Sequence, residues 1–182
     1  MNIRLIILLS FLVVSFLWWL PTLDSEDTVN SDTLSDLIPE YTATFLHQEL
    51  FDKDGNIEQQ VFSQKMEHYA DLSLTHFKKP EFIIYQDNKP FWRLSAKIGN
   101  MQDGLLLLEE SVSMLQVSDN EFVNSITTEF LEINLNTNMV TTDNDITIQG
   151  KNVTVQGKGL TADLELGTLS LVNHVKTIIK GS

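Results

Sequence analysis

The side chains that could do chemistry are spread thinly along this chain, and their spacing argues against catalysis. The four histidines, His47, His68, His76 and His174, have none of the short spacings that bring metal ligands together. The chain has no cysteine, which excludes disulfides, thiolate metal sites and thiol nucleophiles. It also has no Gly-x-Ser-x-Gly, Walker or dinucleotide-binding motif. The sequence therefore predicts a non-enzymatic protein without metal or cofactor, whose histidines have structural or surface roles.

Two acidic segments are further candidates for a site, and each has a simpler explanation. Asp52-Lys53-Asp54-Gly55-Asn56 resembles a calcium-binding loop, but its glycine is fourth in place of sixth, and no glutamate stands at position twelve. We predict instead that Asp54-Gly55 is a hairpin turn. Glu109 and Glu110 could form a pair of catalytic carboxylates, but neighbours on a strand point to opposite faces. We therefore predict that these two residues flank a turn or a bulge.

Beyond the first twenty residues, the chain consists largely of segments in which apolar and polar residues alternate. The alternation is clear at Trp92–Ile98, Leu131–Leu135, Ile146–Ile148, Val153–Val155 and Leu169–Leu171. A period of two predicts strands with one buried face. Turn signals are expected at Lys53–Asn56, Gln86–Pro90, Gln102–Gly104, Ser118–Asn120, Asn136–Asn138 and Gly157–Gly159. Short strands at this spacing predict an all-β sandwich, jelly roll or barrel.

Aromatic residues enlarge the apolar face of the expected strands. They are Phe45, Phe51, Phe62, Phe77, Phe82, Trp92, Phe122 and Phe130. Such a face can belong to an ordinary filled core, or to a groove between two sheets that is wide enough for acyl chains. Periodicity alone does not distinguish a filled core from a lined cavity.

The first twenty residues predict a membrane anchor. Residues 5–20 are apolar except for Ser10 and Ser15, and the run stops at Pro21. As a helix they would extend about 24 Å, and the flanks with a snorkelling Arg4 can make up the roughly 30 Å hydrocarbon core. Because a cation precedes the run and acidic residues follow it, we expect the N-terminus in the cytoplasm and the remainder across the membrane. A cleaved signal peptide fits less well, because no small-x-small cleavage site follows the run.

The rest of the chain divides into a linker and one domain. Residues 23–38 are rich in Ser, Thr, Asp and Asn and contain five acidic side chains without a basic partner, so we expect an extended polar linker. The sequence thus predicts an anchor at residues 1–22, this linker, and a β domain at residues 39–182. The net charge of −13 at pH 7 argues against nucleic acid and anionic lipid head groups as ligands.

Several short motifs follow one another in a characteristic order along the chain. They are Pro39-x-Tyr41, the Gly55 hairpin, Glu67-x-Tyr69-x-Asp71, Phe77-x-x-Pro80, Trp92-x-x-x-Ala96, Thr127-Thr128, Ile133-Asn134-Leu135-x-Thr137, Val140-Thr141, Gly150, Gly159-Leu160 and Val175-Lys176-Thr177. Together with the predicted anchor, this order and spacing resemble the lipopolysaccharide export protein C (LptC) family of Gram-negative bacteria. The resemblance covers the whole chain. It departs in two places: at Glu110-Ser111-Val112, where family members often carry Gly-x-Val, and at Gly150 to Gly159, a stretch about two residues longer than in some relatives.

The resemblance implies a fold, a function and a set of partners. The implied fold is a single antiparallel β-jelly roll with a twisted, open groove, located in the periplasm and preceded by one transmembrane helix in the inner membrane. The implied function is to receive lipopolysaccharide from an inner-membrane ABC transporter (LptB, LptF and LptG) and to pass it to a periplasmic bridge protein, LptA. The energy is expected to come from the transporter, since nothing in the chain is expected to bind ATP.

Two sets of candidate site residues follow. The alternation, with the family match at Phe77 and Trp92, predicts an inward-facing lipid-binding groove lined by Leu46, Phe62, Phe77, Phe82, Trp92, Leu94, Leu135, Ile148, Leu169 and Ile179. The resemblance implies that the N-terminal strand, Tyr41 to Phe51, faces the transporter, and that the C-terminal strand, Val175 to Lys180, pairs with the bridge protein. The partner-interface residues expected on this basis are Tyr41, Phe45, Gly150, Val175 and Thr177.

Two other functions stay open at this point. The chain could be a membrane-tethered periplasmic binding or scaffolding module with a solid core and no lipid groove. It could also be an anchored β-fold hydrolase that uses an acid pair, although no candidate pair has a nearby His or Arg to tune it. An open, apolar channel between two sheets would distinguish lipid carriage from the scaffolding module.

Overall fold

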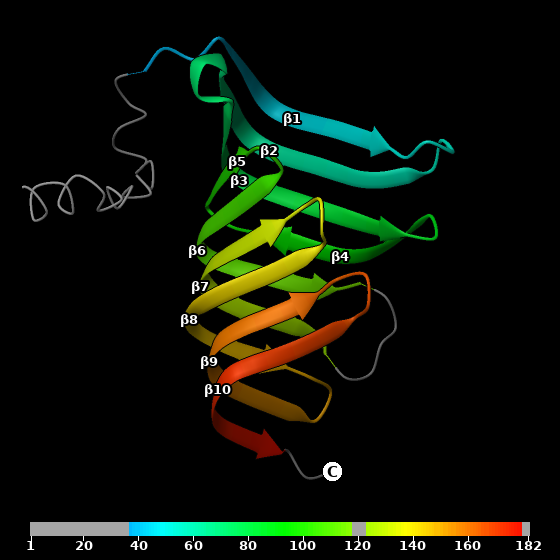
Figure 1. Cartoon of the computed structure of the whole chain (residues 1–182), viewed down its shortest axis with the longest axis vertical. Coiled ribbons are helices and arrows are strands. Elements are labelled where there is room, and N and C mark those ends of the chain that lie inside the picture. Colours follow the sequence, from blue (N-terminus) through cyan, green and yellow to red (C-terminus); the bar gives the residue numbers. More distant parts are fainter. Residues whose placement is uncertain (1–36, 118–122, 180–182) are drawn as a thin grey trace, which may run out of the picture. The chain divides into compact units, whose positions relative to one another are not determined.

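One antiparallel sheet of ten strands makes up the computed structural model, which describes residues 37–117 and 123–179 (Figure 1). The order of the strands across the sheet largely follows their order along the chain. A short 3-10 helix at Ala70–Leu72 joins the second strand to the third. The prediction of an all-β fold is therefore confirmed. The strands are β1 (Tyr41–Phe51), β2 (Ile57–Tyr69), β3 (Leu74–Gln86), β4 (Lys89–Ser95), β5 (Ile98–Gln102), β6 (Leu105–Gln116), β7 (Ser125–Asn134), β8 (Met139–Gln149), β9 (Val153–Asp163) and β10 (Thr168–Ile179).

The predicted anchor at residues 1–22 lies outside the described residues, as does nearly all of the predicted linker. Within the described ranges, no helix is long and apolar enough to cross a membrane. The unit that contains the sheet begins at Ile38. The predicted turn at Ser118–Asn120 also lies outside the described residues.

Most of the other predicted turns connect consecutive strands. Asp87 and Asn88 join β3 to β4 with positive φ angles of 52° and 58°, and Asp103 and Gly104 join β5 to β6 in the same way, at 50° and 81°. Two consecutive residues with positive φ are typical of the tight type I′ hairpin turn, whose twist matches that of the strands. Local sequence therefore predicted these connections correctly.

The Asp52–Asn56 segment is a hairpin turn between β1 and β2, as predicted. One carboxylate oxygen of Asp52 accepts hydrogen bonds from the backbone N–H groups of Asp54 and Asn56, at 2.9 and 2.8 Å. Its other oxygen accepts a bond from the Asn56 side-chain amide at 3.0 Å. The bond from the Asn56 side chain is the largest cause that holds the pKa of Asp52 below its usual value. The Asp52 carboxylate thus stabilises the hairpin turn through these hydrogen bonds.

A line of irregular residues crosses the sheet and bends its strands at one level. The register shifts here between β6 and β7, between β7 and β8, and between β8 and β9. The residues with positive φ along this line are Phe45 on β1, Lys79 on β3, Glu110 and Ser111 on β6, and Gly159 on β9. Because bulges bend strands and increase their twist, the sheet folds over along this line. We call this line the corner.

The corner also explains two features of the sequence. The predicted alternation from Trp92 to Ile98 is interrupted at Ala96 and Lys97, so that β4 and β5 are two strands, each paired with both β3 and β6. Glu109 and Glu110 flank a β-bulge, as predicted. Glu110 has a φ of +61°, a conformation that favours glycine.

The corner divides the sheet into two half-sheets whose inner faces pack together (Figure 1). The first half-sheet contains residues 41–44, 65–69, 74–78, 98–102, 105–109, 130–134, 139–142, 160–163 and 168–171. The second half-sheet contains residues 46–51, 57–63, 80–86, 89–95, 112–116, 125–128, 145–149, 153–158 and 173–179.

The core is packed solidly in its middle. Phe77 from the first half-sheet meets Phe82 from the second edge to face, with ring centroids 5.6 Å apart. Such aromatic pairs add to the stabilisation that burial of apolar surface already provides. The side chains that are almost completely buried come from both half-sheets and include Phe82, Leu94, Leu106, Leu108, Val112, Met114, Ile126, Leu131, Ile133, Val140 and Leu160.

The predicted turn at Gly157–Gly159 is wrong, because both glycines lie within β9. A Cβ atom at Gly157 would lie 2.8 Å from the backbone oxygen of Asn173 on β10. A Cβ atom at Gly159, whose φ is +76°, would lie 2.9 Å from the Cβ of Val172. The glycines therefore allow β10 to approach β9 closely at the corner, which is a second common use of glycine in strands.

We expect Gly159→Ala to lower the free energy of unfolding by about 2–3 kcal/mol, because it combines positive-φ strain with the contact to Val172. Gly167→Ala is the matched control. Gly167 has a φ of +64°, but a Cβ atom at this position would meet nothing within 4 Å, so only the backbone strain of about 1–2 kcal/mol applies. Urea unfolding measures both variants. Equal losses of unfolding free energy in the two variants would show that the contact with Val172 on β10 contributes nothing to the effect of Gly159→Ala.

Candidate binding face and free edges

The inner face of the folded sheet contains seven of the ten residues that were predicted to line a groove. The two half-sheets bring these residues together in one apolar interior, although they come from β1, β3, β4, β8 and the β7–β8 turn. Leu46 and Leu135 are partly buried and pack against the core, whereas the buried ones are Phe77, Phe82, Trp92, Leu94 and Ile148.

Phe62 lies on the opposite face of β2, so its predicted inward placement is wrong. The register pairs Phe62 with His47 on β1, whereas Val61 pairs with Phe82 on β3. Since neighbours on a strand point to opposite faces, Phe62 cannot share the inner face with Phe82. The Phe62 ring instead stacks on His47, with centroids 4.5 Å apart. Val61 and Phe62 are both apolar, so alternation alone could not decide which of them faces inward.

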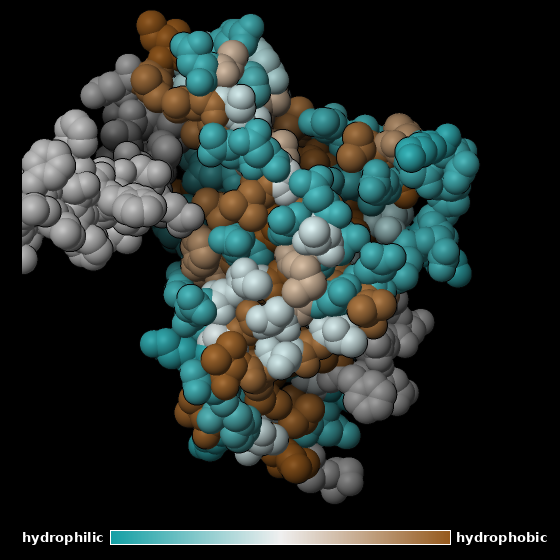
Figure 2. Space-filling view, viewed as in Figure 1, coloured by the Kyte–Doolittle hydropathy of each residue, from teal (hydrophilic) through white to brown (hydrophobic). Residues whose placement is uncertain are grey.

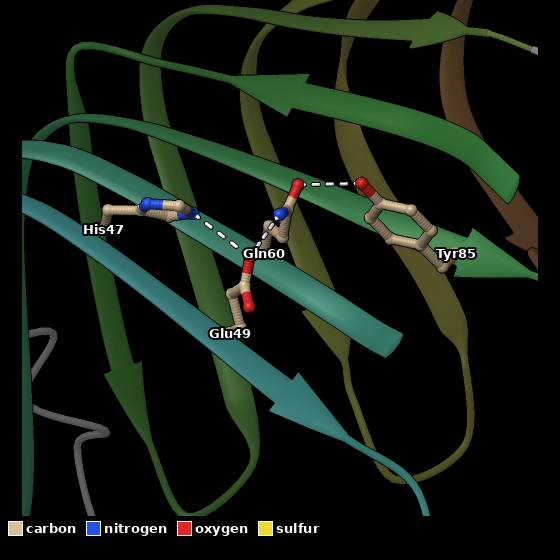
Figure 3. Close-up of polar contacts among 4 residues, drawn as sticks. All are labelled: His47, Glu49, Gln60 and Tyr85. Atoms are coloured by element: carbon tan, nitrogen blue, oxygen red, sulfur yellow. Dashed lines mark hydrogen bonds and ion pairs between the residues drawn. The ribbon is translucent and has the colours of Figure 1, made fainter. Parts of the chain in front are cut away.

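A network of polar side chains includes His47, the stacking partner of Phe62 (Figure 3). The Glu49 carboxylate accepts a hydrogen bond from the Gln60 side-chain nitrogen at 2.8 Å and lies 3.5 Å from His47 Nε2. The Tyr85 hydroxyl donates to the Gln60 side-chain oxygen at 2.7 Å. The network extends over β1, β2 and β3, and its polar side chains serve as hydrogen-bond or ion-pair partners for one another. This patch of the outer face is therefore polar, in contrast to the apolar interior.

The two remaining predicted groove residues, Leu169 and Ile179, are exposed on β10. Leu169 pairs with the core residue Ala162, and Ile179 pairs with Val153. Their side chains are 37% and 76% exposed, respectively. They lack cover because, in the described part of the chain, β10 is the last strand of the sheet. Leu169 nevertheless contributes to a cavity at this end of the domain.

An apolar cavity of about 280 Å³ separates the two half-sheets near the β9–β10 turn. Phe91 and Trp92 both reach it, because the register between β3 and β4 shifts beside them. The Trp92 indole nitrogen has no hydrogen-bond partner within the described part of the chain. One wall consists of Phe91, Trp92, Met114, Gln116, Val123 and Ile126, and the other consists of Ala162, Asp163, Leu164, Gly167, Thr168 and Leu169.

Sequence reasoning found Trp92 and Leu169 but missed the rest of this cavity. Its two walls are distant in sequence and meet only because the corner folds one half-sheet onto the other. The bulged position of Phe91 gives no signal in a pattern of alternation, since a bulge changes which neighbours share a face.

Both edges of the sheet are unpaired within the described part of the chain, because its strand order begins with β1 and ends with β10. An uncovered edge strand can pair with a strand of another chain. Figure 2 shows apolar surface over the lower part of the domain, where β9 and β10 lie. Most of the exposed large apolar side chains lie on the two edge strands: Tyr41, Phe45, Leu50 and Phe51 on β1, and Leu169, Val172, Val175, Ile178 and Ile179 on β10.

The predicted interface residues divide between these two edges. Tyr41 stacks on His68 with ring centroids 4.8 Å apart, and Phe45 is 84% exposed at the corner. Val175 is 68% exposed at the register shift of β10, and the Thr177 hydroxyl lies 2.8 Å from a ring nitrogen of His174. The structure thus places two of these residues on each free edge.

Gly150, the fifth predicted interface residue, lies in the turn between β8 and β9. Its backbone N–H donates to the carbonyl of Val153 at 2.8 Å, and Val153 pairs with Ile179 near the end of β10. Gly150 is therefore grouped with the β10 edge and not with β1, which stands at the other end of the strand order.

Comparison with known proteins relates the whole chain to one family. Residues 5–180 match the family described as "Lipopolysaccharide-assembly, LptC-related". The chain is 27% identical to the lipopolysaccharide export system protein LptC of Haemophilus influenzae over 201 aligned residues, which cover 97% of this chain and 94% of the relative. It is 23% identical to the LptC of Escherichia coli K12 over 141 residues, which cover 76% and 74% of the two chains.

A solved structure supports the same fold. The domain is similar to LptH of Pseudomonas aeruginosa, described as the LptA homologous periplasmic component of the conserved lipopolysaccharide transport device, with a TM-score of 0.54. The match covers 68% of this chain and 95% of LptH at 9% sequence identity, so the likeness concerns the fold alone. The family match, in contrast, extends from the predicted anchor to Lys180, one residue past the end of β10. The chain therefore belongs to the LptC-related family of lipopolysaccharide-assembly proteins.

Proposed function

We propose that this chain is the inner-membrane-anchored, lipopolysaccharide-binding component of the lipopolysaccharide export machinery in the periplasm. It receives lipopolysaccharide from the ABC transporter formed by LptB, LptF and LptG and passes it to the bridge protein LptA. Residues 1–22 anchor it as a single transmembrane helix with a cytoplasmic N-terminus. The observation that carries this proposal is an apolar inner face between two edge strands that have no further partner strand among the described residues, in a chain of this family.

The inner face supports binding of acyl chains. Each buried methylene group contributes about 0.8 kcal/mol, so a few acyl chains are sufficient for strong binding. Because the middle of the core is filled, the chains must enter where the half-sheets can separate, and the cavity near the β9–β10 turn already provides space there. The phosphorylated head group stays in water, since the net charge of the protein is −13.

The two free edges support transfer between proteins. A strand added to either edge extends the sheet through backbone hydrogen bonds, and it joins the interiors of two such domains. β1 follows the predicted anchor and linker in sequence, so we assign the transporter to this edge. β10 is then the edge that pairs with LptA. Apolar side chains on both strands would be covered in these complexes.

The filled core favours a second candidate function. Leu94 and Leu108 are completely buried in the middle of the domain, as in an ordinary sandwich. A scaffolding module would use the same two edges to connect the transporter with the bridge protein, and would carry no lipid inside.

Photo-crosslinking in cells separates these two functions. We expect a photo-reactive residue at Leu46 or Leu169, which lie on the inner side, to trap lipopolysaccharide. The same residue at Phe62 or Arg93 should trap little, because both lie on the outer face. These controls are matched, since Phe62 directly follows the inward-facing Val61, and Arg93 directly precedes the inward-facing Leu94. Equal labelling of the two sets would refute a lipid-binding interior and would favour the scaffolding module.

A further inference from the structure

Phe45, on the free edge strand β1, destabilises the isolated domain in two ways. Its φ of +52° lies in the left-handed region, where a phenylalanine is strained. Its side chain is also 84% exposed to water. The register between β1 and β2 continues from Thr44 to Leu46 and is interrupted at Phe45. The packing of the domain therefore does not account for a phenylalanine at this position.

A cluster of lysines lies beside Phe45, at the same corner of the sheet. Its members, which we call the basic corner, are Lys65 on β2, Lys78 and Lys79 on β3, and Lys97 between β4 and β5. They make up four of the 12 Lys and Arg residues in the chain. Lys65 pairs with Thr44 on β1 and with Lys78 on β3. Because neighbouring strands are about 4.8 Å apart, a partner that covers Phe45 also reaches the basic corner.

The basic corner keeps a local excess of positive charge. Two of its members have a carboxylate partner, at 2.7 Å in the Lys65–Glu67 pair and 3.0 Å in the Lys97–Glu110 pair. The other two make no ion pair within residues 37–117 and 123–179. Like charges directly opposite each other on neighbouring strands are destabilising. The net charge of −13 does not cancel this local field, because salt screens charges beyond about 8 Å.

Ser63 holds part of the basic corner in a fixed arrangement. Its side chain is buried, and its hydroxyl lies 2.7 Å from the carbonyl oxygen of Lys65 and 2.8 Å from that of Lys78. The hydroxyl thus links the two strands that carry the opposed lysines. A surface that is ordered in advance loses little conformational freedom when a partner binds.

These features together indicate one kind of partner. The free edge of β1 can pair with a strand of another protein through backbone hydrogen bonds. An exposed aromatic side chain contributes strongly to binding when it fills a recess in the partner. The lysines are complementary to carboxylates around such a recess. A layer of anionic lipid could neutralise the lysines, but it has no backbone groups for the edge. A protein strand therefore accounts for the edge, Phe45 and the lysines at once.

We propose that Phe45 and the basic corner form the recognition site of the β1 edge. The strand that pairs there belongs to a protein with an apolar recess for the Phe45 ring and acidic side chains around this recess. This inference rests on the proposed function, since it states the chemistry by which the transporter is recognised at β1. The Phe45 ring sets the register of the added strand, and the lysines select an acidic partner.

Phe45→Asn separates recognition from stability, because asparagine tolerates a positive φ and is soluble in water. With the full-length chain and the purified transporter in lipid nanodiscs, we expect the affinity of the two to fall about thirtyfold. The stability of the chain alone should stay the same or rise. Val175→Asn is the matched control, since Val175 is 68% exposed on the opposite edge, and it should leave this affinity unchanged. Unchanged affinity of Phe45→Asn, or a loss that only follows unfolding, would overturn the proposal.

Reversal of two charges tests the basic corner. We expect Lys78→Glu with Lys79→Glu to slow association with the transporter about tenfold. Lys53→Glu with Lys89→Glu makes the same change of net charge at the tips of the β1–β2 and β3–β4 hairpins, and should have little effect. Equal effects of the two double variants would contradict a local site.

The lipid composition and the wild-type chain distinguish the remaining outcomes. The nanodiscs contain phosphatidylcholine, with or without phosphatidylglycerol. A loss of binding that appears only with phosphatidylglycerol would identify a lipid surface as the partner and would overturn the proposal. If the wild-type chain binds the transporter and the Phe45 and lysine variants bind equally well, this inference fails and the proposed function stands. If the wild-type chain does not bind the transporter, both fail.

Discussion

Truncation after Asn173 is expected to abolish co-purification with LptA, while the transporter still co-purifies. The deletion removes residues 174–179 of β10, which include its register shift, pair with residues 153–157 of β9 and are otherwise uncovered in the described part of the chain. Val175 and Ile179 on this part are 68% and 76% exposed and do not belong to the core. If β10 is the edge that receives an LptA strand, its removal eliminates the backbone hydrogen bonds of the complex.

The same deletion should leave the domain folded, because the core cluster contains no residue after Leu171. Truncation after Ile179 is the matched control, since it removes residues 180–182 and keeps all of β10. Affinity purification of tagged variants measures both partners, and circular dichroism checks that the sheet persists. If the shorter chain retains LptA, or loses both partners while still folded, the assignment of the two edges is wrong.

Phe82→Ala is expected to lower the free energy of unfolding by about 3–5 kcal/mol, a large share of the roughly 5–15 kcal/mol typical of a domain. Phe82 is 1% exposed, pairs with Val61 and Leu94, and meets the ring of Phe77 across the corner. Its removal leaves a cavity at the junction of the half-sheets, where neighbouring side chains cannot easily collapse. Loss of this contact should also loosen the corner itself.

Phe62→Ala is the matched control for this substitution. It removes the same atoms from the adjacent strand, but on the outer face, where the ring is only partly buried against His47. We expect a loss of about 1 kcal/mol, since little apolar surface returns to water and no closed cavity forms. Urea unfolding followed by circular dichroism compares the two variants. Equal losses would contradict the face assignment that the register gives.

The sequence by itself determined the class of fold, most connections and the family. Alternation at Leu131–Leu135 and Ile146–Ile148 predicted strands, and Asp103-Gly104 predicted a tight turn. These signals are local, because a strand needs only a period of two and a hairpin turn needs residues that tolerate positive φ. The bulge beside Glu109 and Glu110 was also predicted, since two neighbouring carboxylates on a regular strand would point to opposite faces.

Only the tertiary structure decided the path of the corner, the face of Phe62 and the cavity around Trp92. Gly157 and Gly159 look like a turn in sequence, yet they lie within β9 because β10 approaches them closely. Each bulge at the corner changes which residues of a strand face inward, so a face cannot be counted along the chain past this point. Whether an apolar residue ends up buried then depends on the register of neighbouring strands and on what covers them. Phe62 and Ile179 show this directly, since both are apolar and neither joins the core.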